Sequence, residues 1–424
     1  MIEESEYKKR RDVLALKMSK NSIAVMFASS YKTRSNDTEY PYRQNSNFYY
    51  MTGFKEDNSI LVLVKKKKNY KSILFVNKKD KVEELWNGKR LGVKESKKKF
   101  LIDQVFTQDK FEEKYKEYVA ANNKLYFDFE LRSLKTDLLK KYSKNISIYK
   151  NIAPIIEKMR LIKSDAEIKL IKKAIEITKQ AHHNAMTFNK QDRFEYELLA
   201  EIEHSFKSQG AYSDAYTSIV AGGNNANTLH YIENNKLFKK DDLILIDAGC
   251  EYEYYASDIT RTIPVSGKFT EAQTKVYNLV LDTQLKVLNA IKPGVKRTKL
   301  QRIAVKCLTE ALVELGVLKG DVKKLIKKEK YKKYYPHGIG HWMGIDVHDQ
   351  CPYKDENDDE ILLDKGMVLT IEPGLYLAED DKKVPQLYRG IGVRIEDDIL
   401  VTEDGYQNLS ADIVKTVEDI ENIN

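Results

Sequence analysis

The spacing of apolar residues divides the chain into two regions of different character. From about residue 21 to residue 150, short apolar runs alternate with stretches of helical spacing. Residues 59–64 and 71–76 are two strand-like runs on either side of a lysine-rich turn, which predicts a β-hairpin. Residues 124–128 predict another short strand. This alternation is typical of a mixed α/β domain.

After residue 153 the pattern changes to long helix. Ser164 and Glu167 form a capping box, and Ile168, Ile171 and Ile175 follow on one helix face. We therefore place a domain boundary here and expect an N-terminal domain of residues 1–153 and a C-terminal domain of residues 154–424.

The C-terminal domain continues with helices and strand-like runs in alternation. Two amphipathic helices are expected at about 270–291 and 298–316. Four strand-like runs accompany them, at 242–248, 259–265, 366–372 and 391–401. This order predicts an α+β domain with a largely antiparallel sheet.

Composition adds limits on size, partners and compartment. A chain of 424 residues is long enough for two domains. The net charge of +8 comes mostly from scattered lysines without an arginine-rich stripe, which favours a solvated surface and argues against nucleic-acid binding. Three cysteines, Cys250, Cys307 and Cys351, match neither a zinc ribbon nor a disulfide framework. Without a secretory signal or a membrane-spanning apolar run, we expect a cytoplasmic protein with no membrane partner.

Three carboxylates lie within apolar, strand-like runs of the sequence, at Asp247, Glu372 and Glu396. A buried carboxylate without a partner costs several kcal/mol, so such residues are expected to reach water, pair with a cation or bind a metal. A hairpin that turns at residues 251–254 would pair Asp247 with Asp258 on one face, with Cβ atoms about 5 Å apart. Two aspartates placed in this way repel each other unless a cation lies between them.

The last strand-like run and the histidines add further candidates. Alternation along residues 393–396 sends Arg394 and Glu396 to one face and the two apolar residues to the core. None of the seven histidines lies within the first 181 residues. Any one histidine is more often packed or exposed than a ligand, but the segment HGIGH at 337–341 is followed by another histidine at 348. Such a cluster favours a site.

Four carboxylates and one histidine form a hard, oxygen-rich ligand set. Such a set suits Mn²⁺ or a similar first-row ion, with Co²⁺ or Zn²⁺ as alternatives, better than it suits a thiolate-bound zinc. Two ions about 3.5 to 4 Å apart could deprotonate a water between them and polarise a scissile carbonyl. The chemistry that this set implies is hydrolysis.

Several blocks of sequence carry a resemblance to a known family. They are IDAGCEYEYYASDITRT (246–262), YYPHGIGHWMGIDVHD (334–349), LTIEPGLY (369–376) and RGIGVRIEDD (389–398). In this order they resemble the pita-bread metallopeptidases, and within them the Xaa-Pro aminopeptidases. RSNDTEYPYRQNSNFYYMTGF (34–54) and ELWNGKRLG (84–92) are similar to the N-terminal domain of aminopeptidase P. The resemblance implies a C-terminal pita-bread domain, related to creatinase and methionine aminopeptidase, behind a mixed α/β N-terminal domain.

The resemblance also implies a role for each site residue. Five residues would be the ligands of two metal ions: Asp247, Asp258, His341, Glu372 and Glu396. Asp258 and Glu396 would bridge the ions, and Glu372 would also carry the proton from the nucleophilic hydroxide to the leaving proline nitrogen. The remaining site residues would act on the substrate or hold the ligands in place: His230 and His348 at the tetrahedral intermediate, His337 at the proline pocket, and Arg394 around the ligands.

The implied activity is release of an N-terminal residue that precedes proline, from peptides with proline in second position. The implied assembly is a homodimer or homotetramer, with the N-terminal domain building subunit contacts and limiting access to the cleft. A prolidase, which shares the fold and ligands but requires a dipeptide, is the nearest alternative. A non-catalytic binding protein on the same fold and a creatinase-like hydrolase fit less well, because such proteins usually lack part of the metal set.

Overall fold

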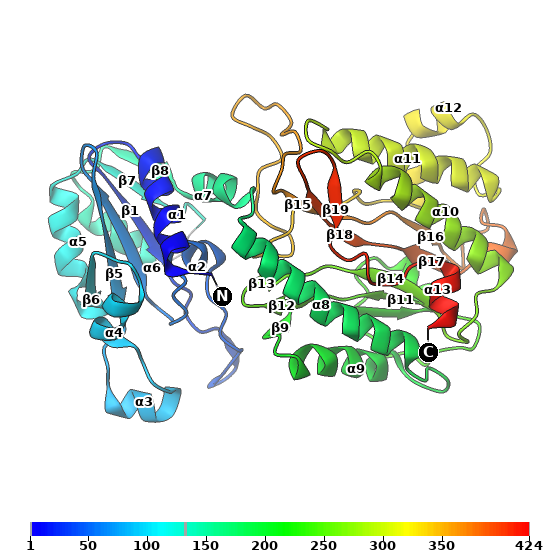
Figure 1. The fold of residues 1–424 in the computed structure, drawn as a ribbon, viewed down its shortest axis with the longest axis horizontal. Helices are drawn as coiled ribbons and strands as arrows, with labels where there is room; N and C mark the ends of the chain where they lie inside the picture. The colour runs from blue at the N-terminus through cyan, green and yellow to red at the C-terminus, as the bar shows by residue number, and fades with distance from the viewer. Residues whose placement is uncertain (1, 131–133, 424) are drawn as a thin grey trace. The chain divides into compact units, whose positions relative to one another are not determined.

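The computed structural model describes residues 2–130 and 134–423, which form two compact units, Met1–Arg160 and Leu161–Asn424. Helix α7 (Ala153–Arg160), which begins at the boundary expected from the sequence, belongs to the first unit. Figure 1 shows both units, each a combination of helices and strands.

A six-stranded mixed sheet forms the centre of the first unit, with strand order β6-β5-β4-β1-β7-β8. Its strands are β1 (Ser22–Phe27), β4 (Ile60–Lys65), β5 (Tyr70–Val76), β6 (Gln104–Thr107), β7 (Lys124–Phe127) and β8 (Ile148–Asn151). The antiparallel pair β4–β5 is the predicted hairpin, and β7 is the predicted strand at 124–128. The pairs β1–β7, β7–β8 and β5–β6 are parallel. The mixed α/β character expected of this unit is confirmed.

Helices and a small hairpin surround this sheet. They are α1 (Glu4–Lys17), α2 (Ser46–Thr52), α3 (Lys81–Asn87), α4 (Gly92–Lys99), α5 (Phe111–Ala120), α6 (Leu134–Tyr142), the 3-10 turn η1 (Gln108–Lys110), and the strands β2 (Thr33–Ser35) and β3 (Thr38–Glu39). All six residues of β1 are buried, so the centre of the sheet is covered on both faces. Side chains of α5 and α6 pack into the core on one of these faces.

The second unit places short antiparallel ladders between two pairs of helices (Figure 1). The helices are α8 (Asp165–Thr187), α9 (Glu195–Ser208), α10 (Glu271–Leu288), α11 (Arg297–Glu314), α12 (Val322–Lys327) and α13 (Val417–Asn422). Both members of the capping box predicted at Ser164 are present at the start of α8. One core cluster joins side chains of α8, α9, α10 and α11 with those of the strands.

Antiparallel pairing is found for every strand pair assigned in this unit. The strands are β9 (Ser213–Asp214), β10 (Ile219–Gly222), β11 (Leu243–Asp247), β12 (Cys250–Tyr252), β13 (Tyr255–Ala256), β14 (Thr260–Pro264), β15 (Val368–Ile371), β16 (Gly374–Leu377), β17 (Ile391–Arg394), β18 (Asp397–Val401) and β19 (Tyr406–Asn408). Short 3-10 turns lie at η2 (Gly223–Asn227), η3 (Lys330–Lys333) and η4 (Gln386–Tyr388). The predicted α+β class with antiparallel pairing is therefore confirmed.

The run at 391–401 is two strands, not the single strand expected from the sequence. β17 pairs with β16, whereas β18 pairs with β15. Residues 395 and 396 lie between them, where the chain passes from one ladder to the next. An apolar run that is buried on both faces gives no local signal of such a break. The break matters because Glu396 lies in it.

Candidate metal centre

The residues singled out from the sequence line one cavity of the second unit. The cavity has a volume of about 420 Å³. All nine predicted site residues are in its wall: Asp247, Asp258, His341, Glu372, Glu396, His230, His337, His348 and Arg394. Apolar side chains complete the wall, among them Ile219, Leu229, Ile232 and Val347. The cavity therefore combines a charged group of residues with an apolar margin.

Asp247 and Asp258 reach this cavity in a register that differs from the predicted one. Asp247, the last residue of β11, lies opposite Thr260 of β14 and not opposite Asp258. The predicted four-residue turn at 251–254 is wrong, because the chain turns within residues 253–254, both of which have positive φ, as two-residue hairpins prefer. The residue opposite Asp247 is therefore two positions further along the chain than predicted. Since side chains alternate with a period of two, Asp258 still lies on the same face as Asp247.

His341 and Glu372 are brought together by a segment that runs along β15. The amide of Thr370 donates a hydrogen bond to the carbonyl of His341 (2.9 Å), and the amide of Glu372 donates to that of Ile339 (2.9 Å). Gly340 permits this close approach, because a Cβ there would lie 1.9 Å from the Thr370 carbonyl oxygen. The Nε2 atom of His341 lies 3.8 Å from Oε1 of Glu372.

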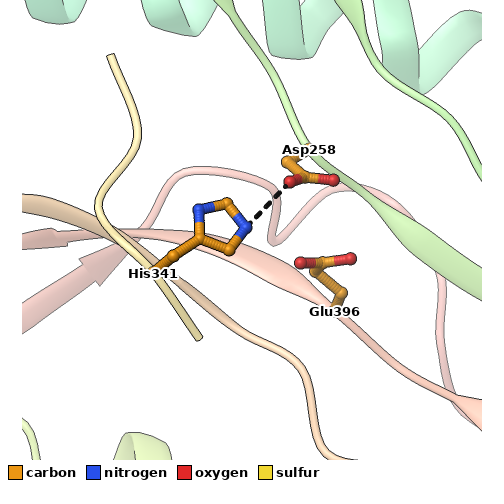
Figure 2. Close-up of side chains that lie close together, drawn as sticks. All are labelled: Asp258, His341 and Glu396. Carbon is orange, nitrogen blue, oxygen red and sulfur yellow. Dashed lines mark ion pairs between the residues drawn. The ribbon is translucent and has the colours of Figure 1, made fainter. Parts of the chain in front are cut away.

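The tightest group of ligand atoms belongs to Asp258, His341 and Glu396 (Figure 2). One ligand atom from each lies within 4.8 Å of the other two, and Nε2 of His341 is 3.2 Å from Oδ2 of Asp258. The Nδ1 atom of His341 lies 3.1 Å from the Trp342 carbonyl oxygen, to which it donates. This bond orients the ring so that Nε2 faces the acids, as in metal-binding imidazoles.

The electrostatics of this group require positive charge. Burial raises the pKa of Glu372 and raises that of Glu396 well above its usual range, and the neighbouring Asp258 charge raises the pKa of Glu396 further. Burial alone would lower the pKa of His341, but its hydrogen bond with Asp258 and the charge of that residue raise the pKa to about 9. These acids therefore retain protons unless a cation neutralises them. The donor set fits a divalent cation on this ground as well as by its chemistry.

Arg394 holds Asp247 and joins the two sides of the site. Its Nη2 atom donates to Asp247, and the Tyr216 hydroxyl donates to the other oxygen of the same carboxylate (2.6 Å). The Nε atom of Arg394 donates to Oγ1 of Thr260 (3.2 Å), and that hydroxyl donates to Oε2 of Glu396 (2.7 Å). Two expected ligands, Asp247 and Glu396, are thus oriented by one guanidinium and two hydroxyls.

His337 is a neutral imidazole within a chain of hydrogen bonds. Burial lowers its pKa to about 4. Its Nδ1 atom lies 2.8 Å from the Gly338 carbonyl oxygen, to which it donates, so Nε2 accepts from the Tyr376 hydroxyl (2.8 Å). That hydroxyl accepts in turn from Nη1 of Arg394 (2.9 Å). The Nδ1 atom also lies 3.5 Å from Glu372, which places His337 beside an expected ligand.

The other two predicted histidines approach the ligands from loops. The ring of His348 stands perpendicular to that of His341, with ring centres 4.4 Å apart. Burial and the charge of His341 lower the pKa of His348. His230 lies in an exposed part of the segment after β10 and lines the cavity. Both histidines can present a ring to a substrate in the cavity.

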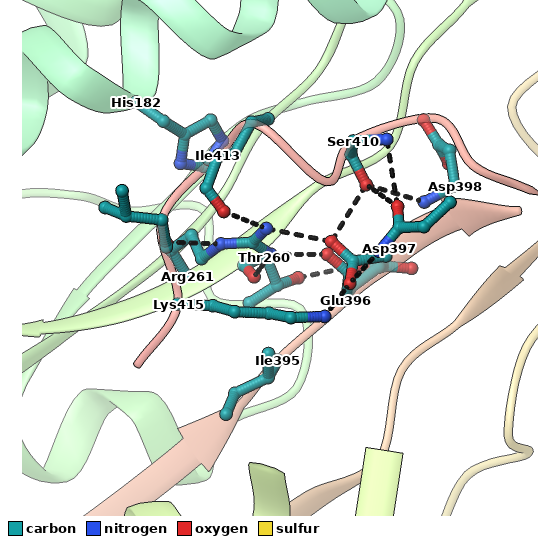
Figure 3. Close-up of polar contacts among 12 residues, drawn as sticks. His182, Thr260, Arg261, Ile395, Glu396, Asp397, Asp398, Ser410, Ile413 and Lys415 are labelled. Carbon is teal, nitrogen blue, oxygen red and sulfur yellow. Dashed lines mark hydrogen bonds and ion pairs between the residues drawn. The ribbon is translucent and has the colours of Figure 1, made fainter. Parts of the chain in front are cut away.

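A buried ionic network lies next to the ligands (Figure 3). The Arg261 guanidinium donates to the backbone carbonyl of Glu396 (2.6 Å) and to Oδ1 of Asp397 (2.8 Å). Asp397 also accepts from Lys415 and from the Ser410 hydroxyl. The positive charges of Arg261 and Lys415 hold the pKa of Asp397 below its usual range in spite of burial. The network fixes the backbone of the segment that carries Glu396.

Three residues that position the ligands or the groups beside them were given no role from the sequence. Thr260 and Tyr376 lie inside the quoted motifs, but the sequence around a hydroxyl in an apolar run does not indicate its hydrogen-bond partner. Tyr216 lies outside those motifs, and no local signal distinguishes it from the other 26 tyrosines of the chain. Their contacts depend on residues that are distant in sequence, so only the folded structure identifies them.

Comparison with known proteins defines the class. A family model described as metallopeptidase family M24 matches residues 169–403, and one described as aminopeptidase P, N-terminal domain, matches residues 7–126. The chain belongs to metallopeptidase family M24. It is a hydrolase that depends on divalent metal, as the ligand set predicted.

Relatives matched over their whole length narrow the class to one activity. A Xaa-Pro aminopeptidase of Haemophilus influenzae is 41% identical over 422 residues, which cover 100% of this chain and 97% of the relative. The structure of proline aminopeptidase P II from Yersinia pestis has a TM-score of 0.95 at 41% identity and covers 100% of this chain and 99% of its own. Aminopeptidase P from E. coli gives a TM-score of 0.95 at 40% identity, with 100% and 98% covered. The chain is thus a metalloaminopeptidase that cleaves before proline, and the predicted activity and fold are confirmed.

Proposed function

We propose that Asp247, Asp258, His341, Glu372 and Glu396 hold two divalent cations, with Mn²⁺ preferred to Co²⁺ or Zn²⁺. The observation that carries this proposal is the convergence of all five side chains on one cavity, three of them with ligand atoms within 4.8 Å. Carboxylate oxygens and an imidazole suit Mn²⁺. When bound, the cations would supply a deprotonated water as nucleophile and polarise the scissile carbonyl.

Side chains of the protein then carry out proton transfer, stabilise the developing charge and shape the proline pocket. Glu372 carries a proton to the proline nitrogen as the peptide bond breaks, a task that suits a carboxylate whose pKa burial has raised. His348, next to His341, and His230 approach the carbonyl and stabilise the negative charge that develops on its oxygen. His337 is held neutral and rigid beside the site, where it bounds the proline pocket.

The substrate is a peptide whose second residue is proline. The apolar margin of the cavity, with Ile219, Leu229 and Ile232, is suited to a proline ring and its neighbours. A solved structure of aminopeptidase P from E. coli contains the inhibitor Pro-Leu. That dipeptide has the sequence that would leave this site after the first residue has been removed.

One experiment tests the metal and the substrate together. Protein stripped of metal receives Mn²⁺, Co²⁺ or Zn²⁺ at matched free concentrations and is given Xaa-Pro, Xaa-Pro-Xaa and Xaa-Ala-Xaa peptides. We expect Mn²⁺ to restore the fastest cleavage of the proline tripeptide, with little cleavage of the alanine version. A higher rate with Zn²⁺ or Co²⁺ would overturn the metal assignment, and cleavage of the dipeptide alone would mark a prolidase.

We further propose that residues 1–153 act as a domain that builds subunit contacts in a homodimer or homotetramer and limits access to the cleft. In support, α3 has no buried residue, and Val82, Leu85 and Trp86 are 65%, 81% and 80% exposed. An exposed apolar cluster of this kind is typical of an interaction surface. Light scattering should show a smaller assembly for L85K but not for L16K, a matched change at a position that is 77% exposed. Equal masses for the two variants would exclude α3 as the interface.

A cytoplasmic location stays a prediction of the sequence. The three cysteines are free thiols, and Cys250 and Cys351 are buried, which is compatible with a reducing compartment. Within residues 2–130 and 134–423, no helix has the length and apolar character that crossing a bilayer requires. Fractionation of the source cells would test the prediction.

A further inference from the structure

Glu195 is a fully buried carboxylate outside the metal site, at the first position of α9. Its exposed fraction is 0%. No salt bridge to Glu195 is found among the residues that the structure describes, so its carboxyl oxygens depend on hydrogen-bond donors. Burial of a carboxylate is costly, and such a cost is offset only where the group has several well-directed donors.

All four donors to the Glu195 side chain belong to one segment, residues 222–236. Oε1 accepts from the amide of Gly222 (2.8 Å) and from Nδ2 of Asn225 (2.7 Å). Oε2 accepts from the Tyr231 hydroxyl (2.6 Å) and from the amide of Lys236 (2.9 Å). One carboxylate therefore holds both ends of the segment and two points between them.

The same segment carries His230 and Leu229, both of which line the cavity of the metal centre. Tyr231, the neighbour of His230, is buried against a small apolar cluster that includes Ile219, so its hydroxyl bond to Glu195 fixes where the backbone of His230 lies. His230 itself is exposed. The position of its ring thus depends on the backbone on which it stands.

We propose that Glu195 is a positioning residue for catalysis, which acts through His230 by holding residues 222–236 in the geometry that the substrate requires. This inference rests on the proposed role of His230. Displacement of a catalytic group by about 1 Å can cost on the order of a hundredfold in rate. Glu195 contacts no expected metal ligand, so its loss should leave metal binding intact.

The test compares E195Q with E197Q, alone and in an H230A background. Glu197 lies two residues further along the same helix turn and accepts from the Phe194 amide (2.8 Å) and Arg193. Among the described residues it has no hydrogen bond with the segment. In E195Q the side chain keeps its shape, but an NH₂ group replaces one of the two carboxylate oxygens. That NH₂ group faces hydrogen-bond donors and cannot accept from them, so about half of the four bonds are lost. We expect kcat/KM for an Xaa-Pro-Xaa peptide at saturating Mn²⁺ to fall about tenfold in E195Q, with unchanged bound metal and near-normal activity in E197Q.

The H230A background separates positioning from general support of the fold. If Glu195 acts through His230, E195Q should have little further effect on kcat/KM in H230A, because the two losses are then not additive. Y231F, which removes one of the four bonds, should give a smaller loss of the same kind. Full additivity, unchanged activity in E195Q, or loss of bound metal in E195Q would each overturn the proposal. Wild-type protein that cleaves no peptide with any of the three metals would instead refute the proposed metal chemistry, and unimpaired H230A would refute the role of His230.

Discussion

The hydroxyl of Thr260 should control how tightly the site binds metal. This side chain is fully buried, donates to Oε2 of Glu396 (2.7 Å) and accepts from Nε of Arg394 (3.2 Å). Thr260→Val keeps the shape and removes the hydroxyl. A hydrogen bond to an ionised group contributes about 1.5 to 3 kcal/mol, so a carboxylate that loses it is less well oriented toward a cation.

The expected size of the effect follows from that free energy. Since 1.4 kcal/mol corresponds to a tenfold change in an equilibrium constant, Mn²⁺ should bind about 10- to 100-fold more weakly to the variant. Loss of a hydrogen-bond partner of a metal ligand typically has an effect of this size. Calorimetric titration of metal-stripped protein with Mn²⁺ measures the affinity directly.

A matched control lies two residues further along the same strand. Thr262 is equally buried, but its hydroxyl donates to the backbone carbonyl of Arg394 (3.0 Å) and not to a ligand. Thr262→Val should therefore alter stability by about 1 kcal/mol and leave Mn²⁺ affinity close to that of the wild type. Equal affinities for the two variants would refute the reasoning that Thr260 acts through Glu396.

Three further predictions follow from buried polar groups. Tyr376→Phe removes the donor to Nε2 of His337, and we expect kcat/KM to fall about tenfold with metal affinity retained; weakened Mn²⁺ binding would show that the hydroxyl supports the ligands instead. Arg261→Leu leaves Asp397 short of a cation and should lower the free energy of unfolding by about 3 to 5 kcal/mol in urea titrations, so a change below 1 kcal/mol would contradict the buried ion pair. Burial lowers the pKa of His182 from 6.5 to about 4, so its contribution to stability is fully present above pH 6.5 and is lost as pH falls toward 4, by about 3 kcal/mol. Unfolding of His182→Gln, followed from pH 7.5 to 4, should lack that part of the loss, and equal pH dependence in both proteins would refute the assignment.

The expected site residues were accessible from the sequence because their chemistry conflicts with their surroundings. Burial of a carboxylate in an apolar run, as at Asp247 and Glu372, costs free energy unless a cation or hydrogen-bond donors offset it. That conflict can be recognised from the sequence alone. Side-chain alternation likewise placed Arg394 and Glu396 on one face, and both line the cavity. Even the wrong register between Asp247 and Asp258 left both on the correct side, because the error was two residues and the period of a strand is two.

Local sequence determined the helices and their caps, the alternation of strands, the α+β class and the types of residue that could hold a metal. These features depend on residues close together in the chain, where spacing and propensity act. Only the tertiary structure decided the break at residues 395–396, the hydroxyls of Thr260, Tyr216 and Tyr376, and the attachment of residues 222–236 to Glu195. Each of these depends on a hydrogen bond or a strand ladder between segments far apart in sequence. The local sequence around a buried acceptor does not identify the donor that folding brings to it.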